Sequence, residues 1–225
     1  MIHYHGTPIS PMKAIETMGG KNFCISYARP DDLKRCLRLA QSLMLDNGAF
    51  SAKTRGQAFD LNGFYSWIDP ILAHPHWGVV PDVIDGTVEE QREMTKTWPF
   101  GKEFGIPVWH LGLPISYLLE LCDSWGRVCF GSSGEYWQIG TSKWCSRMDE
   151  AFNALSKTYT RLPWVHGMRM LGQSAGPWPL ASADSTNVAL HHAEGTVCAG
   201  CMAKRIDSTN PPSLWDIQPL QESLI

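Results

Sequence analysis

The feature that most constrains this chain is a regular succession of eight short apolar or β-branched runs, each bounded by Gly, Pro or Asn. Stretches with helical signals separate most of these runs, so the pattern predicts strands that alternate with helices. Such an order favours parallel pairing through right-handed crossovers. The expected strands are Ile2–His5, Phe23–Tyr27, Leu43–Asp46, Val79–Ile84, Ile106–Leu111, Val128–Gly131, Trp164–Met168 and Leu180–Ala183.

Start signals mark several of the intervening helices. The clearest is a capping box, in which Thr87 is followed three residues later by Glu90. The segment 169–179 contains two glycines and two prolines, and it is predicted to be a loop. The predicted helices cover residues 33–41, 90–98 and 117–122.

Eight alternating strands predict a compact (β/α)₈ TIM barrel, an α/β fold, although 225 residues is short for this architecture. An open doubly wound sheet is the alternative. The sequence carries neither a GxGxxG motif after the first strand nor a Walker-type loop, and this counts against the alternative. We expect one domain over residues 1–225, with a small Cys/His element at 187–205.

Charge and hydropathy limit the partners that such a chain can have. The formal net charge is −3, which counts against a protein that coats nucleic acid through a large positive field. Any polynucleotide must be held by a local basic patch. No apolar run reaches about 18 residues and no signal peptide precedes the first strand, so we expect a cytoplasmic protein without a membrane partner. The candidate phosphate contacts form two alternative groups, and each of them is equally compatible with an ordinary solvated face. The groups are Lys143, Arg147, Lys157 and Arg161, or Lys204 and Arg205.

Polar residues follow nearly every predicted strand. In a barrel, the carboxyl ends of the strands meet at one mouth, where enzymes of this fold have their active sites. Three carboxylates, Asp46, Asp85 and Asp184, are expected to meet there, with Asp82 close by. Each one alone could be a turn or cap residue, but three together repel one another, which a structural site would avoid. His5 and His166 are interpreted as buried supporting residues rather than catalytic ones.

Residues 131–137, GSSGEYW, form a second unusual element. A Gly-Ser-Ser-Gly loop after a strand exposes successive backbone N–H groups that can hold an anion or the edge of a heterocycle. The Tyr136-Trp137 pair then offers a stacking surface. The alternative is a flexible turn above a packed aromatic pair.

Residues 191–201, HHAEGTVCAGC, contain His191, His192, Cys198 and Cys201, and this ligand chemistry suits a structural zinc ion. The alternatives are a reduced CxxC without metal and a redox pair, and the redox pair is disfavoured because the motif does not follow an early strand of a thioredoxin-like unit. The chain has seven cysteines, an odd number, so most are expected to be reduced core residues.

Several ordered segments resemble the tRNA-guanine transglycosylase superfamily, especially its short phage and bacterial branch, which exchanges guanine in DNA for 7-deazaguanine bases. The segment at 43–52 is similar to the third-strand motif of that family, and the segment at 79–87 is similar to its acidic fourth-strand motif. The remaining segments correspond to the fifth strand, the base-binding sixth strand and the nucleophile. The five segments are LMLDNGAFSA, VVPDVIDGT, PVWHLG, RVCFGSSGE and WPLASADSTN.

The resemblance implies base exchange that requires no cofactor, performed by a pentosyltransferase that accepts a free preQ0-like base. It implies that Asp184 is the nucleophile and that Asp46 is the general acid and base. The carboxylate of Asp85 would accept hydrogen bonds from the Watson–Crick edge of the purine. The other residues assigned to substrate binding are Asp82, His110, Gly131, Ser132, Ser133, Glu135 and Tyr27, with Trp137 as a second stacking candidate.

The chain departs from the family pattern in three places. Its only CxxC is CAGC, whereas the family has a CxC-then-C zinc pattern with a later His. Position 110 is His where the tRNA enzymes commonly have Gln, and the basic C-terminal region is short. The first departure puts the zinc site of the family in question for this chain. The other two favour DNA over tRNA as the partner, in the host cytoplasm if the gene is a phage gene. The alternatives are tRNA-guanine exchange, a barrel N-glycosidase or glycoside hydrolase that uses the same acids, and a non-catalytic binder.

Overall fold

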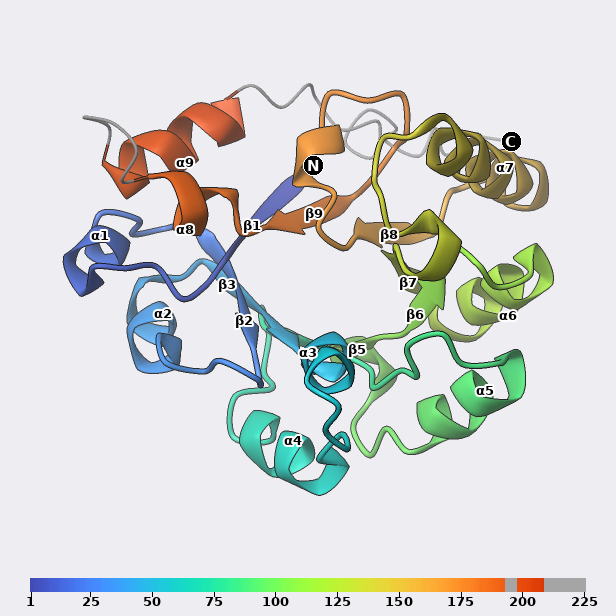
Figure 1. Cartoon of the computed structure of the whole chain (residues 1–225), viewed down its shortest axis with the longest axis horizontal. Coiled ribbons are helices and arrows are strands. Elements are labelled where there is room, and N and C mark those ends of the chain that lie inside the picture. The colour runs from blue at the N-terminus through green and yellow to red at the C-terminus, as the bar shows by residue number, and fades with distance from the viewer. Residues whose placement is uncertain (193–197, 209–225) are drawn as a thin grey trace, which may run out of the picture.

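The computed structural model describes residues 1–192 and 198–208, and it shows a nearly closed parallel α/β barrel, which confirms the predicted fold class. Strands surround a central space and helices lie outside them (Figure 1). All pairings are parallel, in the order β5-β4-β3-β2-β1-β9-β8-β7-β6. The strands are β1 (Ile2–Gly6), β2 (Asn22–Ser26), β3 (Ser42–Asp46), β4 (Trp77–Val79), β5 (Gly105–Ile106), β6 (Val108–His110), β7 (Arg127–Gly131), β8 (Trp164–Gly167) and β9 (Ser182–Ser185).

The predicted fifth strand is divided in two at Pro107. Proline has no N–H to donate to a ladder, so the pairing stops there and resumes on the other side. β5 pairs with β4, while β6 pairs with β7, and the Pro107 carbonyl still accepts from the amide of Cys129 at 2.8 Å. The two edge strands of the sheet are therefore neighbours in the chain, and the barrel comes together at this proline.

Two strand predictions are misplaced. The predicted strand Val79–Ile84 is observed as Trp77–Val79, because Pro81 interrupts the ladder and the chain turns toward the barrel mouth. The predicted strand Leu180–Ala183 is observed as Ser182–Ser185, so the final strand consists mainly of small and polar residues. This shift places Asp184 within the strand rather than after it.

The helices confirm the start signals. The hydroxyl of Thr87 accepts a hydrogen bond from the backbone amide of Glu90 at 3.2 Å, and the carboxylate of Glu90 accepts one from the backbone amide of Thr87 at 2.7 Å. This pair is the predicted capping box. The loop 169–179 contains only a short 3₁₀ turn, Leu171–Gln173. The α-helices are α1 (Met12–Glu16), α2 (Leu33–Leu39), α3 (Ala49–Thr54), α4 (Leu61–Ile68), α5 (Val88–Lys96), α6 (Ile115–Trp125), α7 (Ser142–Thr158), α8 (Asn187–His191) and α9 (Ala199–Ser208).

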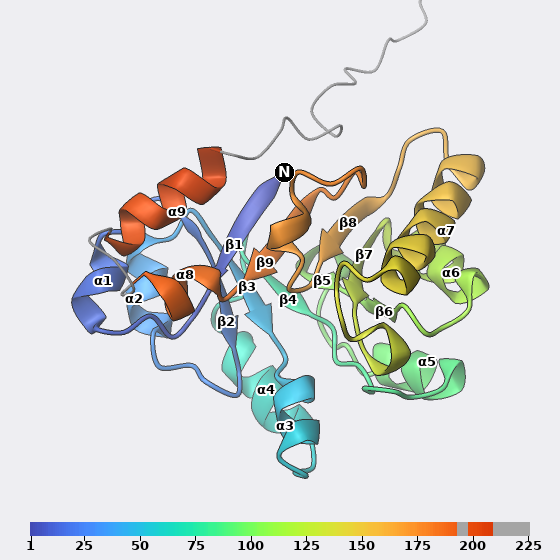
Figure 2. The same cartoon turned by 45° about the horizontal axis from the view of Figure 1, so that its top comes forward.

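The core lies in two layers. Outside the strands, α1, α2, α8 and α9 cover one side of the barrel, and α5, α6 and α7 cover the other (Figure 2). Inside the barrel, large side chains fill the space, and the hydroxyl of Tyr4 accepts from the indole N–H of Trp77 at 2.9 Å. In the described residues, no helix is long and apolar enough to cross a membrane. The inner layer consists of Tyr4, Met44, Trp77, Val79, Ile106, Val108 and Cys129.

Candidate functional site

A cavity of about 300 Å³ opens at the carboxyl ends of the strands, where the sequence places the active site of a barrel enzyme. This volume is at the lower end of the range of small-molecule sites. Asp46, Asp82 and Asp184 all line it, together with His110 and the Gly-Ser-Ser turn. The other lining residues are Gly6, Thr7, Cys24, Ser26, Arg29, Met44, Asn47, Phe50, Ser51, Ile84, Met168, Arg169 and Thr186.

Asp184 projects from β9, and two neighbouring groups approach the same oxygen of its carboxylate. The amide of Arg169 donates to its Oδ1 at 2.8 Å, and Nε2 of His166 lies 3.2 Å from the same oxygen. Arg169 adopts a left-handed backbone with φ of 60°, which directs its amide at the carboxylate. Both of these contacts fall on Oδ1, so within residues 1–192 and 198–208 it is Oδ2 of Asp184 that is left for a ligand in the cavity.

Asp46 ends β3 and has a different environment. Burial raises the pKa of its carboxyl group to about 6, and the nearby charges of Asp184 and Asp82 push the pKa in the same direction. Hydrogen bonds from Ser26 and from the backbone of Gly48 oppose this effect only in part. A carboxyl group with such a pKa can both carry and release a proton near neutral pH.

The third acid of the cavity, Asp82, orients His110. Its Oδ2 lies 2.7 Å from Nε2 of His110, and its Oδ1 accepts from the side-chain amide of Asn47 at 2.8 Å. On the other side of the ring, Nδ1 of His110 lies 3.2 Å from the hydroxyl of Ser133. The imidazole is thus fixed between a carboxylate and a hydroxyl group at the wall of the cavity.

The Gly-Ser-Ser turn is held firmly by hydrogen bonds. The indole of Trp144 donates to the hydroxyl of Ser132 at 2.9 Å, and the guanidinium of Arg169 donates to the Ser132 carbonyl at 2.5 Å. A Cβ added at Gly131 would lie 3.0 Å from Nδ1 of His110, so the glycine permits a close approach. The turn therefore forms a fixed wall of the cavity.

Three of the predicted substrate contacts do not line the cavity. Asp85 lies nearby but is half exposed and forms a 2.5 Å ion pair with Lys53, which lowers the pKa of the Asp85 carboxyl group. The hydroxyl of Tyr27 donates to Asp60 at 3.0 Å. Glu135 pairs with Lys143. The other stacking candidate, Trp137, is exposed.

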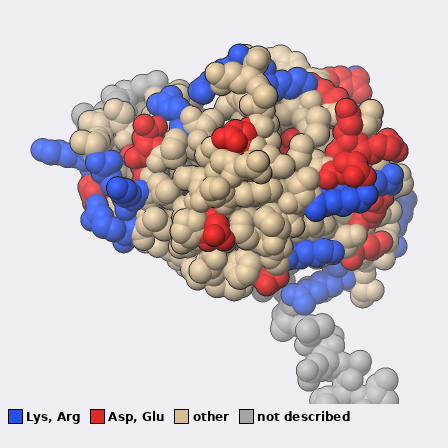
Figure 3. Space-filling model, turned by 90° about the horizontal axis from the view of Figure 1, so that it is seen from below, with Lys and Arg blue, Asp and Glu red and all other residues tan. Residues whose placement is uncertain are grey.

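The predicted phosphate contacts are distributed over several elements. The guanidinium of Arg147 donates to the carbonyls of Leu111 at 2.8 Å and Leu113 at 2.5 Å, so it holds α7 against the barrel. Lys204 and Arg205 are exposed on α9. On the face shown in Figure 3, basic and acidic side chains are interspersed rather than gathered into one basic patch.

Sequence reasoning missed the two arginines that line the cavity, Arg29 and Arg169. Arg169 lies in the predicted loop, and its guanidinium stacks on the ring of Phe50 at 5.3 Å. Arg29 follows β2 and pairs with Asp31 at 3.3 Å. No local pattern distinguishes these arginines from others, because the barrel brings them to the cavity, and the contacts of Arg169 with Phe50 and Ser132 join distant parts of the chain.

The Cys/His element fits zinc only in part. His192 donates through Nδ1 to the Val188 carbonyl at 2.8 Å, and its buried Nε2 has no partner among the described residues, which suits a metal ligand. However, Cys198 and Cys201 form a disulfide, and their sulfurs would have to be reduced to bind a metal. In residues 1–192 and 198–208, no group of three or more His, Cys, Asp or Glu side chains is placed to hold a metal ion, and residues 193–197 of the element lie outside the described residues. Zinc remains a prediction.

The remaining cysteines are free, as most were expected to be. Cys36, Cys122 and Cys129 are buried, and burial raises the pKa of each thiol. Cys24 lines the cavity and its thiol pKa is raised well above the ordinary value, first by burial and then by the nearby Asp184 and Asp46. These thiols are therefore protonated and unsuited to nucleophilic chemistry.

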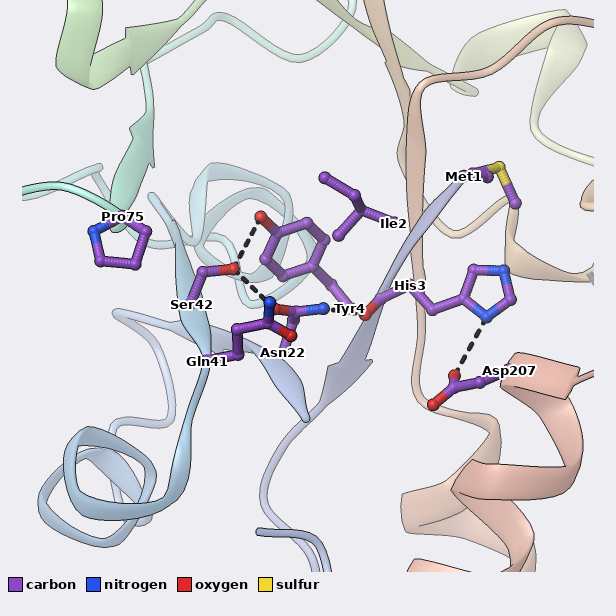
Figure 4. Close-up of a pocket in the computed structure, with 9 residues that line it drawn as sticks. All are labelled: Met1, Ile2, His3, Tyr4, Asn22, Gln41, Ser42, Pro75 and Asp207. Atoms are coloured by element: carbon purple, nitrogen blue, oxygen red, sulfur yellow. Dashed lines mark hydrogen bonds and ion pairs between the residues drawn. The ribbon is translucent and has the colours of Figure 1, made fainter. Parts of the chain in front are cut away.

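A second cavity, of about 560 Å³, lies at the amino ends of β1, β2 and β3 (Figure 4). Its polar side chains bond one another: the hydroxyl of Ser42 lies 3.0 Å from the Tyr4 hydroxyl and donates to Asn22 at 2.8 Å. Asp207 from α9 likewise pairs with His3 at 3.1 Å. The cavity at the carboxyl ends, with its group of carboxylates, is therefore the candidate active site.

No family model, curated protein or solved structure matches the chain. The functional assignment therefore depends on the site itself.

Proposed function

We propose that this protein is a DNA guanine transglycosylase, a pentosyltransferase that replaces guanine in DNA with a 7-deazaguanine base. The single observation that carries the proposal is the contrast between two carboxylates that line one cavity. Oδ1 of Asp184 accepts from the amide of Arg169 and lies 3.2 Å from Nε2 of His166, and Oδ2 has no hydrogen-bond partner among the described residues, whereas burial raises the pKa of Asp46 to about 6. Different environments of this kind separate a nucleophile from a proton carrier.

The reaction would proceed through a covalent sugar intermediate. Oδ2 of Asp184 attacks C1′ of the target nucleotide, the C1′–N9 bond breaks, and its electron pair stays with the departing guanine, which takes the proton carried by Asp46. In the second half, Asp46 accepts the N9 proton of the incoming base. N9 then attacks C1′, the bond to Asp184 breaks, and the nucleophile returns to its carboxylate form.

The remaining wall of the cavity supplies groups for base recognition. His110, fixed by Asp82 and Ser133, presents a polar ring to the cavity, and the Gly131–Ser133 turn adds rigid polar groups beside it. Because the cavity is small, a base in duplex DNA would have to be flipped out of the stack to enter it. Flipping would expose its Watson–Crick edge to these groups.

The direct test follows labelled guanine or preQ0 into DNA. Purified protein is expected to incorporate the base, and Asp184→Asn is expected to reduce incorporation by roughly 10³-fold or more, because the covalent intermediate cannot form. Asp69→Asn removes an exposed carboxylate at the end of α4 and serves as the control. Full incorporation by Asp184→Asn would remove the proposed nucleophile.

The same experiment separates the alternatives. Release of free base without incorporation would indicate a glycosidase, in which water completes the reaction. Incorporation into tRNA but not into DNA would assign the activity to the tRNA branch. DNA binding that survives the loss of Asp46, Asp82 and Asp184, without exchange of any base, would indicate a non-catalytic binder.

A further inference from the structure

A buried row of three side chains ends at the proposed nucleophile. The hydroxyl of Ser182 lies 2.6 Å from Nδ1 of His166, and Nε2 of the same ring lies 3.2 Å from Oδ1 of Asp184. Ser182 and Asp184 lie two residues apart on β9 and therefore share one face of the strand. His166 lies opposite Ser182 on the neighbouring β8. Ser182 and His166 are fully buried, whereas Asp184 lines the cavity.

The order of these groups excludes a serine nucleophile. In a serine hydrolase the hydroxyl faces the substrate and the carboxylate lies behind the histidine. Here the carboxylate lines the cavity and the hydroxyl lies behind the ring, where no substrate can reach it. The histidine is therefore placed to act on the carboxylate.

The ring of His166 is held in place by its surroundings. Trp164 stacks on it with an interplanar angle of 14°, and Tyr4 and Trp77 approach it edge-on at 5.9 and 5.2 Å between ring centroids. With the ring confined by these aromatic groups and its Nδ1 held by Ser182, the only direction left for an Nε2–H group is toward Asp184.

We infer that His166 is a positioning residue that fixes Oδ1 of Asp184 through an Nε2–H donor, so that Oδ2 is the oxygen that attacks the sugar carbon. The inference rests on the proposed function and assigns a role in it to a residue that does not line the cavity. The Arg169 amide, 2.8 Å from the same Oδ1, is the second support. Two donors on one oxygen prevent the carboxylate from rotating.

A set of matched variants tests the role in catalysis. His166→Leu removes the donor and is expected to lower kcat for base exchange by roughly 10- to 100-fold, the equivalent of one hydrogen bond to a charged group, with KM for the free base nearly unchanged. His166→Gln keeps an amide N–H in a similar position and is expected to recover most of kcat. Equal kcat for the Leu variant and the wild type, or no rescue by Gln when both variants melt at the same temperature, would overturn the inference.

A second measurement does not depend on activity. ¹⁵N NMR of the histidine rings, with His166 assigned from the signals lost in His166→Gln, is expected to show a proton on Nε2. A ring with a bare Nε2 would overturn the inference even if base exchange is observed. Conversely, a wild-type protein without exchange activity but with the expected Nε2 proton would refute the proposed function and leave the positioning of Asp184 intact.

Discussion

At the scale of single residues, the cavity shows how two carboxylates of the same chemical type acquire different properties. Oδ1 of Asp184 is contacted by the Arg169 amide and the His166 ring, whereas Asp46 lies near two other acids, and desolvation raises its pKa to about 6. The cause lies in the partners of each group and not in its position along the chain. The raised pKa of Asp46 therefore has a measurable consequence for the free energy of unfolding.

Asp46→Asn tests this consequence. The native pKa of about 6 is above the ordinary value of 3.8, so the folded state binds more protons than the unfolded state, and the contribution of Asp46 to stability falls as the pH rises between these two values. Relative to wild type, Asp46→Asn is therefore expected to gain up to about 3 kcal/mol in the free energy of unfolding between pH 3.5 and pH 7.5.

Urea unfolding at both pH values measures this gain. Asp69→Asn, at the exposed end of α4, corrects for the general effect of removing one negative charge. A difference between Asp46→Asn and wild type that stays constant with pH would show that the carboxyl group is not protonated more readily in the folded state.

At the scale of elements, α9 is attached to the barrel by one acid near its end. Asp207 bonds Nδ1 of His3 at 3.1 Å, Nε2 of His5 at 3.2 Å and the ammonium of Lys21 at 2.5 Å. Burial by itself would raise the pKa of Asp207, but the hydrogen bonds from His3, His5 and Lys21 outweigh it and hold the pKa well below its usual range. At the other end of α9, the amide of Gly200 donates to the Thr17 hydroxyl at 2.8 Å.

Replacement of Asp207 by Asn is expected to loosen this attachment. The stabilisation from a carboxylate with a lowered pKa is present above the unfolded pKa of about 3.9 and is lost as the pH falls through the folded pKa, so the effect should be full at pH 7. We expect a loss of about 2 kcal/mol in the free energy of unfolding. Hydrogen exchange should accelerate in α9 while α5 and α6 keep their protection. Unchanged exchange in α9 would show that its apolar contacts are sufficient.

At the scale of the whole molecule, the net charge of −3 limits how the proposed DNA substrate can be bound. Arg29 and Arg169 are the two arginines at the cavity, and in Figure 3 charges of both signs lie mainly toward the edges of a face whose middle is largely uncharged. An interface with so few cations releases few counterions when it binds DNA. Binding should therefore rely on the flipped base as much as on phosphate contacts.

The salt dependence of DNA affinity tests whether the protein makes only a few phosphate contacts. Two phosphate contacts predict a slope of about −2 for the logarithm of the association constant against the logarithm of salt concentration. Arg29→Ala should reduce the magnitude of the slope by about 1, whereas Arg38→Ala, on the exposed side of α2, should leave it unchanged. A slope steeper than about −5 would instead indicate a larger basic surface, such as one that includes Lys204 and Arg205.

The sequence by itself determined the alternation of strands and helices, the capping box at Thr87 and the presence of Asp46 and Asp184 at the barrel mouth. Each of these follows from local rules: the period of apolar residues, the chemistry of helix starts and the polarity of residues that follow a strand. The division of the fifth strand at Pro107 could also have been predicted from the sequence, because proline has no N–H to donate to the hydrogen-bond ladder of a sheet.

Only the tertiary structure decided which groups share the cavity. Asp82 and Asp85 are three residues apart, yet Asp82 bonds His110 inside the cavity, while Asp85 has a left-handed backbone and pairs with Lys53 outside it. His166 and Arg169 likewise meet Asp184 only because β8 and β9 are neighbours in the barrel. These contacts join residues 15 to 32 positions apart, and so they depend on how the whole barrel packs rather than on any local pattern.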